Sequence, residues 1–278
     1  MGSIDVRPSS SVRDDSSSPP LLVYVTGFGP FNNVPQNPTE TLIRELPRHL
    51  VKQPLPGVDL CGCEVIEVSA EASNVAVQRI HQTVRERVRQ CCGAGGITHA
   101  VIVHLGVYAS DNTYRLESLA YNEAAFSVPD ERKWQPRCAT VCEAGEKRLA
   151  CRLPVHQMNE DLRRQGFKCQ VSVDAGRFVC NFLYYRSLFE AATHDTDIPV
   201  LFVHVPQFFM FDLQEQLSFL SSLFVVIRQR WCECKCEGGA EAAGVPVLRM
   251  DGEDGMAMLG DDDEGEEREG EVGVLQTA

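Results

Sequence analysis

The 278-residue sequence lacks an excess of basic residues, because 26 Lys and Arg stand against 39 Asp and Glu for a net charge of −13. This excludes a generally basic nucleic-acid binder. Long apolar runs are also missing. The longest, residues 217–227, contains three serines and falls far short of the ~20 residues needed to span a bilayer. The first 20 residues have no apolar segment of the kind found in signal peptides. We therefore expect a cytoplasmic protein without a membrane span.

The cysteine pattern lacks the marks of a disulfide scaffold or a zinc site. Twelve cysteines in 278 residues are sparse compared with small secreted proteins that depend on disulfides. Cys232, Cys234 and Cys236 are separated by single residues, whereas zinc sites favour wider spacings and a fourth ligand. The glycine pair in residues 26–31 lacks the third glycine of a dinucleotide-binding loop. We expect free thiols, and neither a metal nor an organic cofactor.

Composition divides the chain into three parts. Residues 1–20 are rich in Ser, Pro and Asp, and residues 237–278 hold thirteen acidic residues against two arginines and no aromatic residue. Such segments bury too little apolar surface to fold, so both are predicted to be disordered. One domain over residues 21–236 is left with a net charge of −1. The acidity belongs to the tail, and an interaction protein that works through this tail is one alternative.

Short apolar runs and helical periodicity alternate along the predicted domain. The predicted strands cover residues 21–26, 63–68, 100–105, 168–173 and 200–205. The predicted helices cover residues 39–46, 72–89, 158–165, 178–189 and 213–228, with Thr39 expected to cap the first of them. This alternation predicts an α/β fold whose parallel or mixed sheet is covered on both faces. In such sheets, reactive groups lie at strand ends and in the first turns of the helices.

Cys180 is the cysteine whose position most favours chemistry. It falls in the first turn of the helix predicted to begin around Phe178, after the turn at residues 174–176. Free backbone N–H groups and the helix dipole at such a position lower a thiol pKa and favour a thiolate nucleophile. The alternative is that Cys180 is simply a small buried hydrophobic residue.

His204 is the candidate general base. It lies near the end of an apolar strand that is stopped by Pro206, where a crevice is expected. The alternative is a hydrogen-bonded histidine of the core. A third group should orient the imidazole, and Glu117 is one candidate. The residues alone give little reason to prefer it over Asp111 or Glu123.

Phe28 and Phe31 occupy a Gly/Pro turn that follows the first predicted strand. A loop of this kind can present two rings to a small apolar ligand. The alternative is an ordinary turn with two buried phenylalanines.

Four sequence blocks, taken in order and spacing, carry a family resemblance. They are VTGFGPF followed by Asn37-Pro38-Thr39, HLGV followed by LESLAYNEAAFSVPDE, DAGRFVCNFLYY, and FVHVP. Over about residues 22–227 the chain resembles pyroglutamyl peptidase I, also called pyrrolidone-carboxylate peptidase, a family of cysteine peptidases. Its nearest likeness is to the eukaryotic members.

The resemblance implies a twisted three-layer αβα sandwich with a mostly parallel sheet. It also implies hydrolysis of an N-terminal pyroglutamyl residue from peptides through a thioester. The family's Cys–His–Glu triad falls on Cys180, His204 and Glu117. The residues that stack on or enclose the pyroglutamyl ring fall on Phe28, Phe31, Phe178 and Val179. The expected partners are pyroglutamyl peptides, with no nucleic acid and no membrane, and both a monomer and a homo-oligomer stay open.

Two positions depart from the family pattern. Many members carry an arginine ten residues after the triad glutamate, thought to stabilise the oxyanion, where this chain has Ser127. Many bacterial members carry a glutamine where this chain has Val107. Losing one oxyanion donor costs about 10²–10³-fold in turnover in studied enzymes. The alternative function is therefore a catalytically weak or inactive homologue that binds pyroglutamyl peptides.

Overall fold

A computed structural model describes residues 20–31, 36–91, 99–110, 112–194 and 198–233 of the chain. The segments predicted to be disordered lie outside these residues, apart from Pro20, and so do Asp111, Cys234 and Cys236. Within the described ranges, no helix combines the length and the hydropathy that crossing a bilayer requires.

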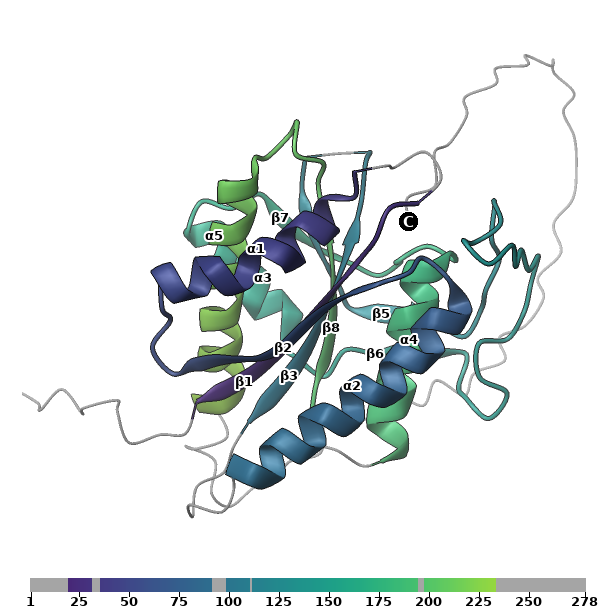
Figure 1. Cartoon of the computed structure of the whole chain (residues 1–278), viewed down its shortest axis with the longest axis horizontal. Helices are drawn as coiled ribbons and strands as arrows, with labels where there is room; N and C mark the ends of the chain where they lie inside the picture. The colour runs from purple at the N-terminus through teal and green to yellow at the C-terminus, as the bar shows by residue number, and fades with distance from the viewer. Residues whose placement is uncertain (1–19, 32–35, 92–98, 111, 195–197, 234–278) are drawn as a thin grey trace, which may run out of the picture.

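A six-stranded sheet forms the centre of the molecule (Figure 1). In spatial order its strands are β2 (Val58–Ile66), β1 (Leu21–Phe28), β3 (Ala100–Val107), β8 (Val200–Val205), β4 (Tyr114–Glu117) and β7 (Cys169–Ser172). The first four are parallel, whereas β4 runs antiparallel to β8 and parallel to β7. The expected mixed, mostly parallel sheet is confirmed. A small second sheet pairs β5 (Leu119–Tyr121) with β6 (Arg148–Ala150).

Helices cover both faces of the large sheet. One face carries α1 (Pro38–Lys52), α3 (Val155–Arg164) and α5 (Leu213–Ile227), and α5 continues into the π-helical turn η3 (Arg228–Glu233). The other carries α2 (Ala70–Cys91) and α4 (Val179–Thr193), which pack against each other below and to the right of the sheet in Figure 1. Each face has its own apolar core, so the architecture is the expected αβα sandwich.

The start of α1 differs from the prediction that Thr39 caps it. Asn37 is the cap, and its side-chain oxygen accepts from the N–H of Thr39 at 3.1 Å. The Thr39 hydroxyl instead accepts from the N–H of Phe28 at 2.8 Å, tying the helix to the end of β1. Asn37 is the cap because proline is favoured at the first position of a helix, which Pro38 occupies, and the cap is the residue before that position.

Three short strands escape the sequence prediction. β4 has four residues, and β5 and β6 have three each, too few for a periodic pattern. The omission matters because β4 carries Glu117 at its end. β2 also begins at Val58, five residues earlier than predicted, because its half-exposed edge position needs no continuous apolar run.

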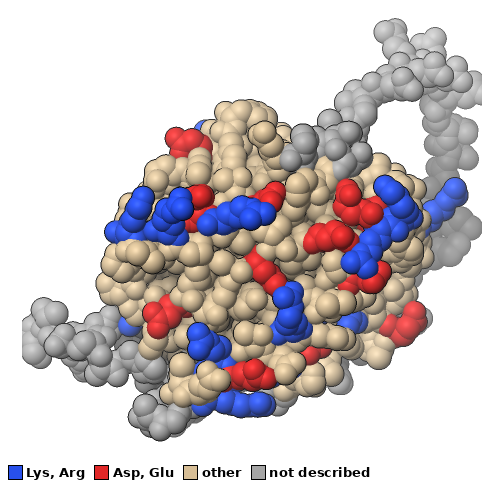
Figure 2. All heavy atoms as spheres, viewed as in Figure 1, with Lys and Arg blue, Asp and Glu red and all other residues tan. Residues whose placement is uncertain are grey.

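The surface carries charge of both signs. In Figure 2 the Lys and Arg side chains lie interspersed with Asp and Glu on the face shown, without a broad patch of one sign. Many are paired, as in the ion pairs of Arg44 with Glu40 and of Arg132 with Glu67. This agrees with the net charge of −1 over residues 21–236.

Candidate active site

Cys180 is the second residue of α4 and is completely buried. The helix begins at the cap residue Phe178, which provides no side-chain hydrogen bond to the first turn. The sulfur lies against β3 at Gly106, where a methyl group in place of hydrogen would come within 2.9 Å of Sγ. Only glycine at this position of β3 leaves room for the thiol.

His204 and Glu117 form a buried pair between neighbouring strands. Nδ1 of His204 lies 2.8 Å from Oε1 of Glu117, and the two residues are at most 2% exposed. Nε2 of His204 is buried and has no hydrogen-bond partner among the described residues. His204 is the register neighbour of Gly106, so the imidazole and the Cys180 thiol lie on the same face of the sheet. The structure therefore places Cys180 on the same face of the sheet as the bonded His204–Glu117 pair.

The beginning of α4 is bonded to the segment that follows Glu117. Asn181 is fully buried, and its side-chain oxygen accepts from the N–H of Tyr121 at 2.8 Å. Its amide group donates to the carbonyls of Tyr121 and Glu123 at 2.9 and 3.0 Å. One turn further along, the Tyr184 hydroxyl donates to the Glu117 carbonyl at 2.8 Å. The helix that carries the thiol thus holds the strand end that carries the glutamate.

Glu123, the second carboxylate that sequence reasoning left open, points elsewhere. It accepts from Nε of Arg177 at 3.2 Å. Arg177 also donates to the Asp174 carboxylate at 2.5 Å and the Gly176 carbonyl at 2.7 Å, and its guanidinium lies over the Tyr121 ring. Arg177 therefore stabilises the turn before α4 and pairs with Glu123. Glu117 is the carboxylate that contacts the imidazole of His204.

The thiol's electrostatic environment differs from the expectation of a lowered pKa. Burial, and then the charge of Glu117, raise the pKa of Cys180 well above its usual range, against the hydrogen bond from its own backbone N–H. Desolvation of a thiolate exceeds the benefit of the helix terminus. Burial therefore favours the protonated thiol, and Cys180 needs a base beside it to react.

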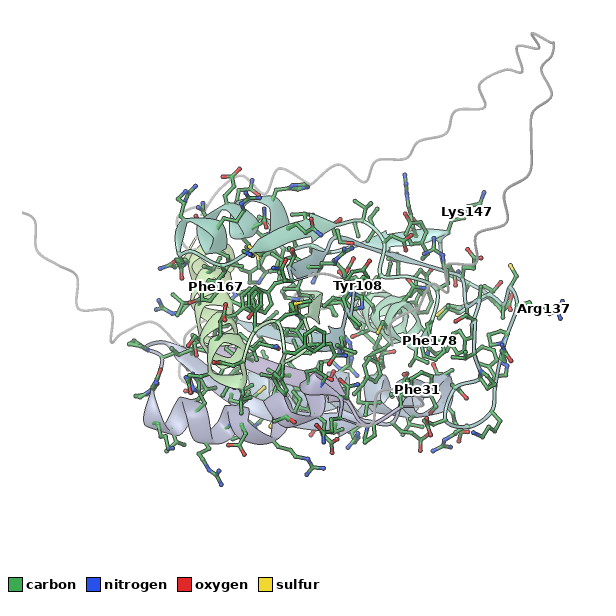
Figure 3. The ribbon with its side chains drawn as sticks, turned by 90° about the horizontal axis from the view of Figure 1, so that it is seen from above. Phe31, Tyr108, Arg137, Lys147, Phe167 and Phe178 are labelled. Carbon is green, nitrogen blue, oxygen red and sulfur yellow. The ribbon has the colours of Figure 1, made fainter. Side chains whose placement is uncertain are left out.

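Aromatic rings line the turn before Cys180. The Phe178 ring lies 5.1 Å from Phe31 and 4.7 Å from Phe126, and Figure 3 shows Phe31 and Phe178 next to each other. Phe126 in turn contacts Trp134 edge-on at 5.1 Å. Phe28 and Val179, the other two predicted pocket residues, are fully buried in the same apolar core. Sequence reasoning missed Phe126 and Trp134, which come from an irregular segment without a periodic signal.

Two further buried histidines lie on this face of the sheet. The ring of His81, on α2, is 2.9 Å from the Ser187 hydroxyl, and that of His104, on β3, is 2.7 Å from the Thr26 hydroxyl. Burial is the main cause that lowers the pKa of each to about 3. Both are neutral core histidines at physiological pH.

Cysteine and metal chemistry elsewhere is limited. All nine cysteines that the structure describes are free thiols. In the same described ranges, no group of three or more His, Cys, Asp or Glu side chains is placed to hold a metal ion.

A thiol at a helix start, a His–Glu pair and an αβα sandwich together define the class of cysteine peptidases with a Cys–His–acid arrangement. The family model described as pyroglutamyl peptidase matches residues 21–214. The chain belongs to the pyroglutamyl peptidase family.

Curated relatives and solved structures agree with this assignment. The pyrrolidone-carboxylate peptidase of Streptococcus suis is 28% identical over 186 residues, covering 67% of this chain and 78% of the relative. A Vibrio vulnificus protein of the same name is 27% identical, covering 66% and 77%. The crystal structure of pyrrolidone carboxyl peptidase from Thermus thermophilus is 26% identical with a TM-score of 0.59, covering 74% of this chain and 99% of that one. The Thermococcus litoralis structure, at 20% identity and a TM-score of 0.63, covers 77% and 96% and shares the fold.

Proposed function

We propose that the protein is a cysteine-type omega peptidase that hydrolyses an N-terminal pyroglutamyl residue from peptides. The observation that carries this proposal is the buried His204–Glu117 pair, with Nε2 of His204 unpartnered among the described residues, on the face of the sheet where the Cys180 thiol lies. The names of the relatives support the choice of substrate.

In the first half of the reaction, the Cys180 sulfur attacks the carbonyl carbon of the pyroglutamyl residue. Its proton passes to Nε2 of His204 during the attack, since burial favours the protonated thiol. The tetrahedral intermediate then collapses, and its C–N bond breaks. His204 returns the proton to the leaving amine, and a thioester of Cys180 remains.

In the second half, a water molecule gives a proton to His204 and attacks the thioester carbonyl. The C–S bond breaks, the sulfur regains its proton from the imidazolium, and pyroglutamic acid leaves. Glu117 fixes the imidazole tautomer through Nδ1 and stabilises the imidazolium in both halves. No step calls for a metal or an organic cofactor.

The first turn of α4 offers the oxyanion donors. Helix starts leave their first N–H groups without intrahelical partners, and no side chain caps this one. The N–H groups of Val179, Cys180 and Asn181 are therefore the groups we assign to the oxyanion. Ser127 is exposed, and Arg177 is held by Glu123 and Asp174. Neither side chain takes the place of the family arginine.

Phe31 and Phe178 are the residues we assign to the pyroglutamyl ring, with Phe28 and Val179 behind them. A lactam is flat and uncharged, so aromatic side chains and a few backbone hydrogen bonds suit it. We also propose a cytoplasmic location, in keeping with the free thiols of the described residues.

A fluorogenic pyroglutamyl amide tests the proposal directly. We expect the wild type to release the fluorophore and the Cys180→Ala variant to be at least about 10³-fold slower, as for loss of other catalytic nucleophiles. Cys169→Ala is the matched control, because Cys169 is also a buried free thiol but lies in the opposite core. It should keep the wild-type rate.

The Ser127 departure keeps the inactive, peptide-binding homologue as the second candidate. A wild type no faster than Cys180→Ala, but still able to bind a pyroglutamyl peptide, would establish that reading and reject the enzyme.

A further inference from the structure

Beside His204 lies an aromatic ring covered by a cation. Tyr108 follows β3, and its N–H donates to the Val205 carbonyl at 2.9 Å, which fixes its position beside β8. Its ring centroid is 5.9 Å from that of His204. The guanidinium carbon of Arg115 lies 3.6 Å from the Tyr108 ring centroid. Both residues are half-buried, so part of each remains exposed, although Nε of Arg115 is buried.

Arg115 reaches this place through the reversed strand. In the antiparallel pairing of β4 with β8, Arg115 is directly opposite His204. Cross-strand partners project from the same face of a sheet. The guanidinium, the phenol ring and the imidazole therefore form one group on the face that holds Cys180.

The reaction divides the surroundings of Cys180 into two sides. The acyl group of the substrate belongs beside Phe31 and Phe178, whereas the leaving amine must be within reach of Nε2 of His204 to receive its proton. Figure 3 shows Tyr108 apart from the adjacent Phe31 and Phe178. The residue bearing the leaving amine then extends past His204 toward Tyr108 and Arg115.

We propose that Tyr108 and Arg115 form the binding subsite for the residue that follows pyroglutamate, and that this subsite favours an acidic over a basic side chain. The inference rests on the proposed function and adds a substrate preference to it. A cation already occupies one face of the Tyr108 ring, so a second cation is repelled while a carboxylate is attracted. The Glu117 carboxylate lies at Nδ1 of His204, whereas the Arg115 guanidinium lies directly on the Tyr108 ring, so the charge nearest to this ring is the cation.

Three dipeptide amides of equal length test the preference, namely pyroglutamyl-glutamate, pyroglutamyl-glutamine and pyroglutamyl-lysine amide. We expect kcat/KM to fall in that order, with about 3- to 10-fold between the first and the last, as for a half-buried charge pair. The preference should shrink as salt is raised, because salt screens exposed charges.

Substitution of Arg115 should abolish the preference for the glutamate amide over the lysine amide. Arg115→Gln is expected to bring the glutamate-to-lysine ratio to about one, and Arg115→Lys to retain part of it. Arg44→Gln makes the same change in net charge on the surface of α1 and should keep the wild-type ratio. A ratio in Arg115→Gln equal to that of the wild type, or a wild type that prefers lysine, overturns the subsite.

Binding separates this inference from the proposed function. Calorimetry on Cys180→Ala, with and without Arg115→Gln, measures the affinities of the glutamate and lysine amides without turnover. Tighter binding of the glutamate amide that disappears with Arg115→Gln supports the subsite, even if the fluorogenic assay shows no hydrolysis. Equal affinities for the two amides in Cys180→Ala, or no binding of either, overturn it.

Discussion

On β3 and β8, alternate residues face opposite sides of the sheet and serve different purposes. Toward α1, α3 and α5 both strands present only aliphatic side chains, Val101, Val103, Leu105, Leu201, Val203 and Val205. Toward α2 and α4 the same strands present His104, Gly106, Phe202 and His204 among the apolar residues. One face of the sandwich is an apolar core, and the other buries polar chemistry at some cost in stability. Damage to the two faces should therefore have separable effects, on stability and on activity.

Among changes on the face that carries His204, Glu117→Gln is expected to have the largest effect, a loss of kcat. The amide keeps the shape but can neither fix the imidazole tautomer nor balance the imidazolium, and the equivalent change elsewhere lowers kcat by about 10⁴-fold. Steady-state kinetics with the fluorogenic amide measure this loss. The midpoint of denaturant unfolding should move little by comparison. A Glu117→Gln variant within tenfold of the wild-type kcat would break the assignment of Glu117 to the imidazole.

On the opposite face, Phe219→Ala should reduce stability and spare chemistry. The Phe219 ring on α5 is fully buried and stacks on Tyr114 of β4 with centroids 3.7 Å apart. Phe→Ala in a core costs about 3–5 kcal/mol in the free energy of unfolding, which urea denaturation measures. At temperatures where the variant stays folded, kcat should remain within a few-fold of the wild type. A large loss of kcat without a loss of stability would show that the two faces are not independent.

A third effect concerns acid and the buried histidines. Burial lowers the pKa of His81 and of His104 from the usual 6.5 to about 3 in the folded protein. Below pH 6.5 these two histidines bind protons in the unfolded chain but stay neutral in the folded protein. The free energy of unfolding therefore falls as the pH drops from 6.5 toward 3. Each histidine contributes a slope of up to about 1.4 kcal/mol per pH unit.

Replacing a histidine by the amide that keeps its hydrogen bond should flatten this slope. His81→Gln retains the position of Nε2 beside Ser187, and His104→Asn retains that of Nδ1 beside Thr26. The measurement is the free energy of unfolding between pH 4 and 7, read against His156→Gln, a change at an exposed histidine of α3. A slope unchanged in both variants would mean that these histidines are charged in the folded protein.

The sequence predicted the αβα layers because long apolar strands and amphipathic helices carry strong local signals. Cys180 and His204 were recognisable for the same reason, as each lies at the end of a clear element. Glu117 was not separable from Glu123 by composition. What decides between them is the antiparallel pairing of a four-residue strand, and the competing claim of Arg177 on Glu123. Contacts between residues that are far apart along the chain produce no periodic pattern in the sequence, so they could not be predicted from it.

The raised pKa of the Cys180 thiol was also beyond sequence reasoning. A helix N-terminus is visible in the sequence, and by itself it favours the thiolate. Complete burial over Gly106 is a property of the assembled layers, and here it outweighs the helix. Likewise, Tyr108 and Arg115 meet only because β4 is reversed beside β8.

The hydrogen bonds of Asn181 to the segment after Glu117 have a consequence for how the molecule assembles. They join residues about sixty positions apart, and the His204–Glu117 bond joins residues 87 apart. Helices form early and locally, whereas contacts between distant segments wait for the chain to close large loops. During refolding, helical signal should therefore return before the segments around Cys180 are joined. The rate at which hydrolysis reappears during refolding should therefore report the formation of these long-range contacts, which completes folding.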